Sequence, residues 1–344
     1  MITHRLAYRR YALPLRAPVR TAHGVWTTRE GVIVRTESPD GQVGYGEAAP
    51  IPGFGPETVE ADVAVLHKLG DTIHAERLAL VPPELGAVRQ ALQAAMGWTA
   101  GPPRREHLPV AALLPAGRDA LLRIEPLAEA GFRTFKWKVG VGDAADEIAL
   151  LDDVLARLPE GAKLRLDANG AWDHHTAERW LARCADYPIE HVEQPIAAED
   201  RQATDRLLGL AGDYPTMIAL DESLVGAGDL DCWLEAGWPG VYVVKPALFG
   251  EPAALLEKLS AARARVVFSS ALETALGARQ ALRVAFAWAG ETDAAGRPVQ
   301  PRAVGFGVWP LFADARFDGP ALAPFVRRTD VDHINPEVIW NALS

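Results

Sequence analysis

The feature that most constrains the fold is a short apolar run ending in a charged side chain, which recurs five times in mid-chain. The five runs span residues 132–139, 164–172, 189–195, 217–223 and 241–246. They carry Lys136 and Lys138, Asp167, Glu193, Asp221 and Lys245, which recur about every 24–29 residues. Each interval fits one βα unit. Because the carboxyl ends of parallel strands meet at one mouth of a closed barrel, we expect these charged groups to converge.

The second run has an alternative interpretation. Asp167 and Asn169 lie two residues apart, so on a strand they would share a face. The sequence Asp-Ala-Asn-Gly is also typical of a turn in which Asp and Asn side chains bond to nearby backbone groups. The same pattern in the following runs favours the strand end.

The alternation of strands and helices predicts an α/β fold, a (β/α)7β TIM-like barrel. Strands are expected near residues 108–114, 133–139, 163–168, 189–193, 217–221, 240–245, 265–269 and 303–307. Helices are expected between most of them, whereas the polar segment 289–302 is expected to be a loop. The barrel domain is predicted to span residues 104–317, after a Gly- and Pro-rich linker at 101–105.

Residues 1–103 have a different pattern, which predicts a small α+β domain. Strands are expected at 4–15, 32–36 and 42–47, and helices at 56–69 and 84–97. Two apolar, Gly- and Pro-rich loops are expected, one at 17–29 with His23, Gly24 and Trp26, and one at 48–55 with Phe54. Each is either a rigid connection packed on its own domain or a lid over a site formed elsewhere.

Charge and composition exclude several classes of protein. The net charge of −10, without a basic stripe, argues against a nucleic-acid partner. The sequence has no run of 18 apolar residues and does not begin like a signal peptide, so neither a membrane span nor secretion is expected. Two distant cysteines, Cys184 and Cys232, favour a reduced, cytoplasmic protein.

One motif resembles a nucleotide-binding fingerprint. Residues 140–145 fit G-x-G-x-x-A between an expected strand and an expected helix. A dinucleotide fingerprint should open the first βαβ unit of a doubly wound sheet, whereas this one lies in mid-chain. A tight turn between strand and helix is the favoured interpretation.

The three converging carboxylates predict a metal site. Asp167, Glu193 and Asp221 offer hard oxygen ligands without His or Cys, which favours Mg²⁺, with Mn²⁺ as the second choice, over zinc. Without a cation the three carboxylates would repel one another and raise each other's pKa values. The alternative is that each is an isolated cap or a structural ion pair.

The lysines at the same mouth predict proton-transfer chemistry on a small-molecule carboxylate. Lys136 and Lys138 share a strand face, so the Lys136 charge is expected to lower the pKa of Lys138 and make it a base. Such a base could remove the proton next to a metal-bound carboxylate, while Lys245 stabilises the enediolate. Alternatively, Lys136 is a solvated strand end and Lys245 a surface lysine.

The order Lys-x-Lys, Asp-x-Asn, Glu, Asp-Glu, Lys resembles the enolase superfamily, in particular its muconate-lactonizing-enzyme subgroup. Residues 164–172, 219–224, 244–246 and 269–274 are most similar to the o-succinylbenzoate synthases. The resemblance implies a (β/α)7β barrel with an N-terminal capping domain, to which residues 318–344 would return. It implies syn-dehydration of 2-succinyl-6-hydroxy-2,4-cyclohexadiene-1-carboxylate to o-succinylbenzoate in menaquinone or phylloquinone biosynthesis.

The resemblance also implies residue roles. Lys138 would be the acid–base lysine, Lys245 would stabilise the enediolate, and Asp167, Glu193 and Asp221 would bind magnesium. The candidates for substrate binding or support are Arg165, Asn169, Glu222, Ser269, Ser270 and Phe54.

Other functions stay open at this stage. Relatives in the subgroup racemise N-succinylamino acids or epimerise dipeptides with the same two lysines, although residues 268–273 lack an Asp-x-Asp pair for a dipeptide ammonium. The non-enzymatic alternative is a binding protein whose barrel is stabilised by its metal ion. The oligomeric state is left open.

Overall fold

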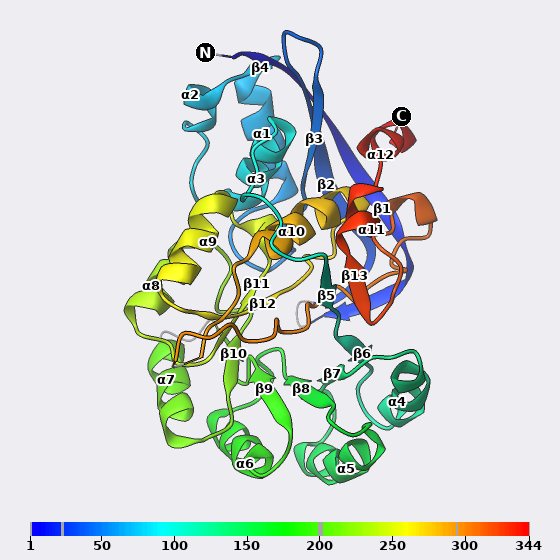
Figure 1. The fold of residues 1–344 in the computed structure, drawn as a ribbon, viewed down its shortest axis with the longest axis vertical. Helices are drawn as coiled ribbons and strands as arrows, with labels where there is room; N and C mark the ends of the chain where they lie inside the picture. Colours follow the sequence, from blue (N-terminus) through cyan, green and yellow to red (C-terminus); the bar gives the residue numbers. More distant parts are fainter. Residues whose placement is uncertain (1, 22–23, 199–201, 294, 344) are drawn as a thin grey trace.

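The computed structural model describes residues 2–21, 24–198, 202–293 and 295–343. An antiparallel sheet with its helices forms one end of the molecule, and a parallel barrel with an outer layer of helices forms the other (Figure 1). The predicted α/β barrel with an N-terminal α+β domain is confirmed. No helix in the described ranges is both long and apolar enough to cross a membrane.

The N-terminal domain packs three helices on a four-stranded sheet of order β3-β2-β1-β4. Its elements are β1 (His4–Thr21), β2 (Gly24–Glu37), β3 (Val43–Ala48), α1 (Val59–Leu69), β4 (Thr72–Ile73), α2 (Ala75–Leu78) and α3 (Gly86–Ala95). The Thr58 hydroxyl accepts a hydrogen bond from the Ala61 N–H and so caps α1, whose apolar face with Leu66 and Leu69 is buried.

The predicted loop at 17–29 was wrong. These residues extend β1 and β2 into a long hairpin, in which Val19 pairs with Trp26. The register shifts between Pro14 and Val19, so the turn-forming residues that suggested a loop are accommodated by an irregularity in the strand. His23 lies outside the described residues.

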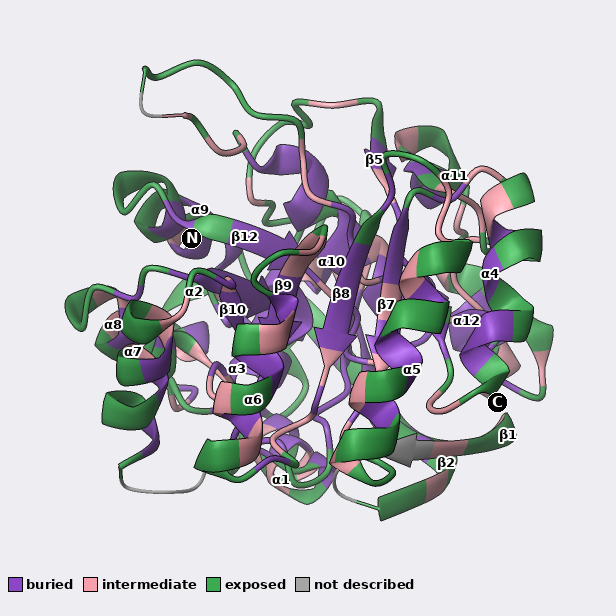
Figure 2. Ribbon diagram, turned by 90° about the horizontal axis from the view of Figure 1, so that it is seen from below, coloured by how far each residue is buried: buried purple, intermediate pink, exposed green. Residues whose placement is uncertain are grey.

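Seven parallel strands form the barrel sheet, in the order β12-β11-β10-β9-β8-β7-β6. The strands are β6 (Ala112–Leu114), β7 (Thr134–Lys138), β8 (Lys163–Asp167), β9 (Ile189–Glu193), β10 (Ile218–Leu220), β11 (Val241–Val244) and β12 (Arg265–Phe268). The helices are α4 (Asp119–Glu129), α5 (Ala144–Arg157), α6 (His174–Cys184), α7 (Ala203–Asp213), α8 (Ala227–Glu235), α9 (Pro252–Ala261) and α10 (Ala275–Ala287), with a 3-10 turn η1 (Pro246–Leu248) after β11. Viewed from below, the strands are buried and the helices expose their outer faces (Figure 2).

The closure of the barrel differs from the prediction at two segments. The expected strand at 108–114 is split, because β5 (His107–Pro109) pairs with β13 (Phe325–Arg327) outside the barrel. The expected eighth strand at 303–307 is reduced to single bridges, Val110 with Val304 and Ser269 with Gly305. Pro109 has no N–H to donate, but its carbonyl accepts from the Val304 N–H at 2.7 Å, which holds this edge together.

Buried ion pairs brace the closing segment from inside the barrel. Arg165 donates from Nη1 to the Ala303 carbonyl at 2.8 Å and from Nε to Glu190 at 2.7 Å. Arg302 donates to the same Glu190 at 2.9 Å. Because β8 and β9 thereby bond directly to residues 302–303, the barrel closes without a regular eighth strand.

The turn at residues 140–142 is a tight connection between β7 and α5, as predicted. The N–H groups of Gly140, Val141 and Gly142 all donate to the carboxylate of Glu147, at 2.7, 3.2 and 3.0 Å. A side chain of the same chain therefore takes the donors that would otherwise hold a phosphate.

The C-terminal segment contains η2 (Ala315–Phe317), β13, α11 (Arg328–Asp332) and α12 (Pro336–Ala342). Arg9 of β1 lies over the Trp340 ring, 4.2 Å from its centroid, and donates to the Trp340 carbonyl at 2.6 Å. Residues 318–344 thus include a contact with the N-terminal sheet. The domain boundaries at 103/104 and 317/318 stay a proposal.

Candidate active site

Two lysines project from β7 toward the carboxyl end of the barrel. They alternate with the buried Trp137, so Lys136 and Lys138 share the inner face of the strand. Pairing with β8 sets Lys138 beside Asp167, and pairing of β8 with β9 sets Asp167 beside Glu193. Register between neighbouring strands therefore assembles this half of the site.

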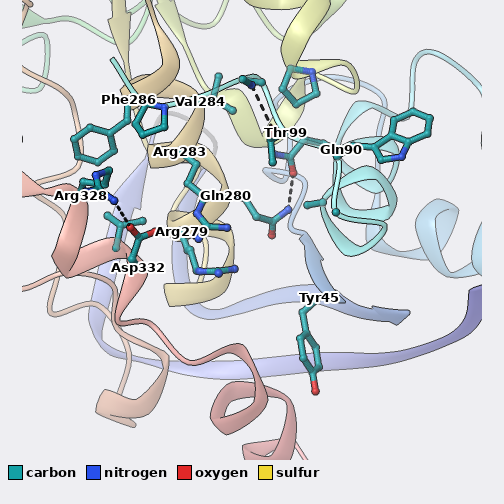
Figure 3. A pocket seen from close by; sticks show the side chains of 18 residues that line it. Tyr45, Gln90, Thr99, Arg279, Gln280, Arg283, Val284, Phe286, Arg328 and Asp332 are labelled. Carbon is teal, nitrogen blue, oxygen red and sulfur yellow. Dashed lines mark hydrogen bonds and ion pairs between the residues drawn. The ribbon is translucent and has the colours of Figure 1, made fainter. Parts of the chain in front are cut away.

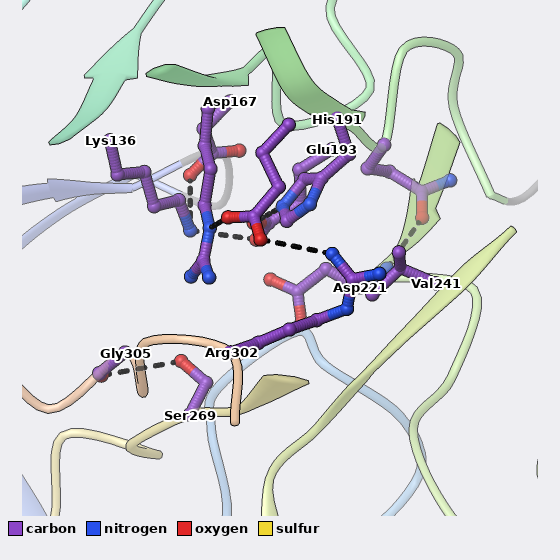
Figure 4. Close-up of polar contacts among 12 residues, drawn as sticks. Lys136, Asp167, His191, Glu193, Asp221, Val241, Ser269, Arg302 and Gly305 are labelled. Atoms are coloured by element: carbon purple, nitrogen blue, oxygen red, sulfur yellow. Dashed lines mark hydrogen bonds and ion pairs between the residues drawn. The ribbon is translucent and has the colours of Figure 1, made fainter. Parts of the chain in front are cut away.

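Lys136 lies between two of the predicted metal ligands. Its ammonium is 2.9 Å from Asp167 Oδ2 and 2.7 Å from Glu193 Oε1 (Figure 4). Burial opposes charge on Lys136, but the two carboxylates prevail and raise its pKa above the usual value. Burial alone would raise the pKa of Glu193, yet the Lys136 ammonium holds it below its usual range. The Lys136 charge is thus matched by two carboxylates, whereas the sequence suggested an action on Lys138.

Lys138 is held by an amide. Its Nζ donates to Asn169 Oδ1 at 2.8 Å, and Asn169 Nδ2 donates to Glu222 Oε1 at 3.0 Å. Asn169 has a φ of 46°, a left-handed conformation that Asn tolerates better than most residues, so the turn after β8 can aim the amide at Lys138. Burial, together with the nearby Asp167, raises the pKa of Glu222 to about 7.

The other half of the site centres on Asp221 and Lys245. Asp221 directly follows β10 and Lys245 directly follows β11, and their side chains form a buried ion pair. Burial lowers the pKa of the Lys245 ammonium, and the nearby carboxylate of Glu193 opposes that shift. Three strands, β8 to β10, separate β7 from β11 in the sheet. The two candidate catalytic lysines therefore enter the mouth from opposite sides.

The 48–55 loop of the N-terminal domain reaches this site. The Phe54 ring lies over Lys245, with Nζ 4.3 Å from the ring centroid, and only 8% of Phe54 is exposed. A Cβ on Gly55 would lie 2.3 Å from Cγ1 of Val225, so the loop also packs closely on the segment after β10. This is the position that the lid interpretation requires.

Arg29 fixes the same loop to the barrel. The buried guanidinium donates to the carbonyls of Ala49 and Pro50 in the loop and to those of Ala271 and Leu272 after β12. No sequence pattern indicates this role, because the two backbone segments lie more than 200 residues apart in the chain. One buried arginine thus joins the N-terminal domain to the mouth of the barrel.

Two further residues that the sequence did not single out support the carboxylates. His191 lies on β9 two residues before Glu193, is fully buried, and has its Nε2 3.9 Å from Glu193 Oε2. Burial lowers the pKa of His191 to about 4, so the ring is neutral at pH 7. Gln194 accepts at Oε1 from the N–H groups of Asp221 and Ser223, both at 3.1 Å, and so ties the ends of β9 and β10 together.

The two serines after β12 bond within the protein. Ser269 Oγ donates to the Gly305 carbonyl at 3.4 Å, at the barrel closure. Ser270 Oγ donates to Glu273 Oε2 at 3.0 Å, and burial raises the pKa of Glu273 to about 7. Arg165 likewise lies inside the barrel in the ion pairs described above. Substrate contacts for Ser269, Ser270 and Arg165 stay a prediction.

The donor set at the mouth fits a hard divalent cation. Asp167, Glu193 and Asp221 supply carboxylate oxygens, and each carboxylate here contacts a lysine ammonium instead. In this arrangement the described residues contain no group of three or more acidic, His or Cys side chains spaced to hold a metal. Because buried carboxylates are stable only beside positive charge, this cluster favours the binding of a cation.

Both domains of the chain match known protein families. Residues 120–303 match the family model described as Enolase C-terminal domain-like, and residues 3–100 match the model described as MenC, N-terminal domain. The chain is 43% identical over 313 residues to the o-succinylbenzoate synthase of Thermosynechococcus vestitus, covering 88% of this chain and 92% of that protein. The chain belongs to the o-succinylbenzoate synthase family of the enolase superfamily.

Further relatives include other synthases and a dipeptide epimerase. The o-succinylbenzoate synthase of Thermobifida fusca is 31% identical over 94% of this chain and 88% of its own length. The crystal structure of the o-succinylbenzoate synthase from Thermosynechococcus elongatus, complexed with Mg in the active site, superposes with a TM-score of 0.82. It is 40% identical and covers 98% of this chain and 99% of that one. A hydrophobic dipeptide epimerase of Roseobacter litoralis is 29% identical over 67% of this chain and 72% of its own length.

Proposed function

We propose that this chain is an o-succinylbenzoate synthase, a hydro-lyase that removes water from 2-succinyl-6-hydroxy-2,4-cyclohexadiene-1-carboxylate to give o-succinylbenzoate. The observation that carries the proposal is 43% identity to a synthase over 88% of the chain, which spans both the N-terminal domain and the barrel. The buried mouth with two lysines on opposite sides supports the chemistry. The reaction belongs to menaquinone biosynthesis.

Lys138 is the acid–base group in this proposal. Its neutral amine takes the proton from the carbon that bears the substrate carboxylate, and the resulting ammonium returns that proton to the departing hydroxide as water. A syn elimination needs a base on only one face of the ring, so one lysine can perform both transfers. Asn169, through its 2.8 Å hydrogen bond, orients Lys138 between the two steps.

Lys245 acts by charge. It lies across the mouth from Lys138, buried beneath Phe54, where water is excluded and a positive charge stabilises a developing enediolate strongly. Its ion pair with Asp221 fixes its position. Lys136 balances the charge of Asp167 and Glu193 from beneath.

Asp167, Glu193 and Asp221 would hold a divalent cation, which we propose to be magnesium. When bound, the cation supplies positive charge beside the substrate carboxylate and so lowers the free energy of the enediolate. Gln194 holds the backbone at Asp221 by a hydrogen bond, and the buried His191 ring lies 3.9 Å from the Glu193 carboxylate. The substrate is a small carboxylate, and we propose a cytoplasmic location, in which the exposed free thiol of Cys232 would stay reduced.

The test is a direct assay of the purified chain with three substrates. With magnesium, the cyclohexadiene substrate should be converted to an aromatic product, and EDTA should abolish the reaction. N-succinylamino acids and dipeptides, assayed for loss of optical activity, should react far more slowly. Rapid racemisation or epimerisation without dehydration would instead assign the chain to one of those activities.

A further inference from the structure

A cavity lies away from the barrel mouth, where the N-terminal domain meets the barrel. It has a volume of about 320 Å³ and lies between α3 with the segment after it, α10, and α11 (Figure 3). The residues that line it include Trp98, Arg279, Arg283, Phe286, Arg328 and Asp332. None of the candidate active-site residues is among them.

The lining carries more positive than negative charge. Arg279 and Arg283 project from α10 and Arg328 from α11, whereas Asp332 is the one acidic side chain in the lining. Asp332 pairs with Arg283 and with Arg328, each at 3.0 Å, so its carboxylate is already shared. The excess of guanidinium groups occurs in a chain whose net charge is −10.

Arg279 is the arginine of this lining that forms no ion pair with Asp332. Within the described residues it makes no hydrogen bond or ion pair, and its Nε is buried without an acceptor. Burial lowers its pKa to about 10, Arg283, one turn further along α10, adds repulsion, and the charge of Asp332 offsets only part of this. An acceptor that enters the cavity would therefore form a stabilising hydrogen bond with this buried guanidinium.

The other walls of the cavity are apolar, so they could contact the apolar part of a ligand that carries the acceptor. Val284, Phe286 and the half-exposed Trp98 give carbon and aromatic surface. The Gln280 side chain is fixed in place, because its Oε1 accepts from the Glu47 N–H at 2.7 Å and its Nε2 donates to Gln90 at 2.9 Å. The cavity is therefore built in advance of any ligand.

We propose that this cavity is a binding site for a small organic anion, an apolar or aromatic body with one carboxylate or phosphate group. The anionic group pairs with the guanidinium of Arg279, and the body lies against Trp98 and Phe286. The proposal is independent of the dehydration chemistry, because it uses none of the residues at the barrel mouth.

The test is calorimetric titration of the full chain with three probes that share one ring, namely phenyl phosphate, benzoate and benzamide. At least one of the two anions should bind and the neutral benzamide should not. The stronger anion identifies the preferred head group. Arg279→Gln should weaken that binding at least about tenfold, as expected for loss of a charge-assisted contact. Arg118→Gln, which removes an exposed arginine paired with Asp153, is the matched control and should bind as the wild type does.

Two further measurements test whether the loss of binding is due to unfolding, and whether the probe binds in this cavity rather than at the barrel mouth. Because Arg279 makes no hydrogen bond or ion pair with a described residue, and its charge is opposed by burial and by Arg283, Arg279→Gln should melt close to the wild-type temperature. Trp98→Ala, at a half-exposed position, should fold normally and also weaken binding. The proposal is overturned if neither anion binds, if benzamide binds equally well, or if Arg279→Gln and Trp98→Ala both bind as the wild type does.

Discussion

At the barrel mouth, the sequence predicts which charged residues form the site. It does not predict which of these residues contact one another. Each charged residue follows an apolar run, so its place at a strand end could be predicted. Which groups touch depends on strand register, which sets Lys138 beside Asp167 and Asp167 beside Glu193. The hydrogen bond that Gln194 accepts from the Asp221 N–H joins the ends of two neighbouring strands and has no local signal in the sequence.

The proposed role of Asp167 as a magnesium ligand can be tested by substitution. Asp167→Ala should lower magnesium affinity by more than about tenfold in calorimetric titration, because one of three proposed ligands is lost. Dehydration should be abolished, while far-UV circular dichroism stays close to wild type. Asp167→Asn is the matched control for volume and should also lose affinity. Unchanged magnesium binding in both variants would remove Asp167 from the site.

Among the elements, the 48–55 loop is the one whose function the structure clarifies most. Its sequence left open a rigid connection or a lid, and the contacts of Arg29 and Phe54 show that it is both fixed and placed over Lys245. The 17–29 segment could not be predicted correctly, because its proline and glycine resemble a loop, whereas the described residues pair as the end of the β1–β2 hairpin.

Phe54→Ala should impair the reaction more than the fold. Loss of the ring opens Lys245 to water, which weakens its electrostatic effect, so kcat/KM should fall about 10–100-fold. Phe54→Leu, which keeps an apolar cover, should retain more activity. Steady-state kinetics paired with thermal melts test this. A lower melting temperature at full kcat/KM would contradict the lid role.

A buried acid pair, Glu57 before α1 and Asp62 within it, has a predictable pH dependence. Glu57 accepts from the Ala87 and Val88 N–H groups at 2.9 and 3.0 Å, whereas the oxygens of Asp62 receive no hydrogen bond from a described residue. Burial, with Glu57 beside it, raises the pKa of Asp62 to about 10, so Asp62 holds a proton in the fold.

Asp62→Asn should therefore stabilise the protein. In the wild type the folded state keeps a proton that the unfolded chain loses near pH 4, so stability falls as the pH rises from about 4 toward 10. The amide needs no such proton. At pH 8 the variant should gain about 2–4 kcal/mol in free energy of unfolding, measured by urea titration. An equal pH slope in both proteins would contradict this assignment.

At the scale of the whole molecule, the sequence predicted the barrel with its N-terminal domain, and missed how the barrel closes. Seven strands follow from apolar periodicity, but the eighth position depends on Arg165, Arg302 and Glu190, which meet only in the folded chain. The junction of the N-terminal domain with α10 and α11, where the Arg279 cavity lies, likewise has no local sequence signal.

The central claim is that Lys138 transfers the proton in both directions while Lys245 contributes charge. The most direct measurement follows deuterium exchange into a non-eliminating substrate analogue, alongside dehydration, in two variants. Lys138→Ala should lose exchange and dehydration together, by at least about 1,000-fold. Lys245→Arg, which keeps its charge but is a poor base, should retain part of the dehydration. Dehydration that survives in Lys138→Ala and disappears in Lys245→Arg would contradict the account.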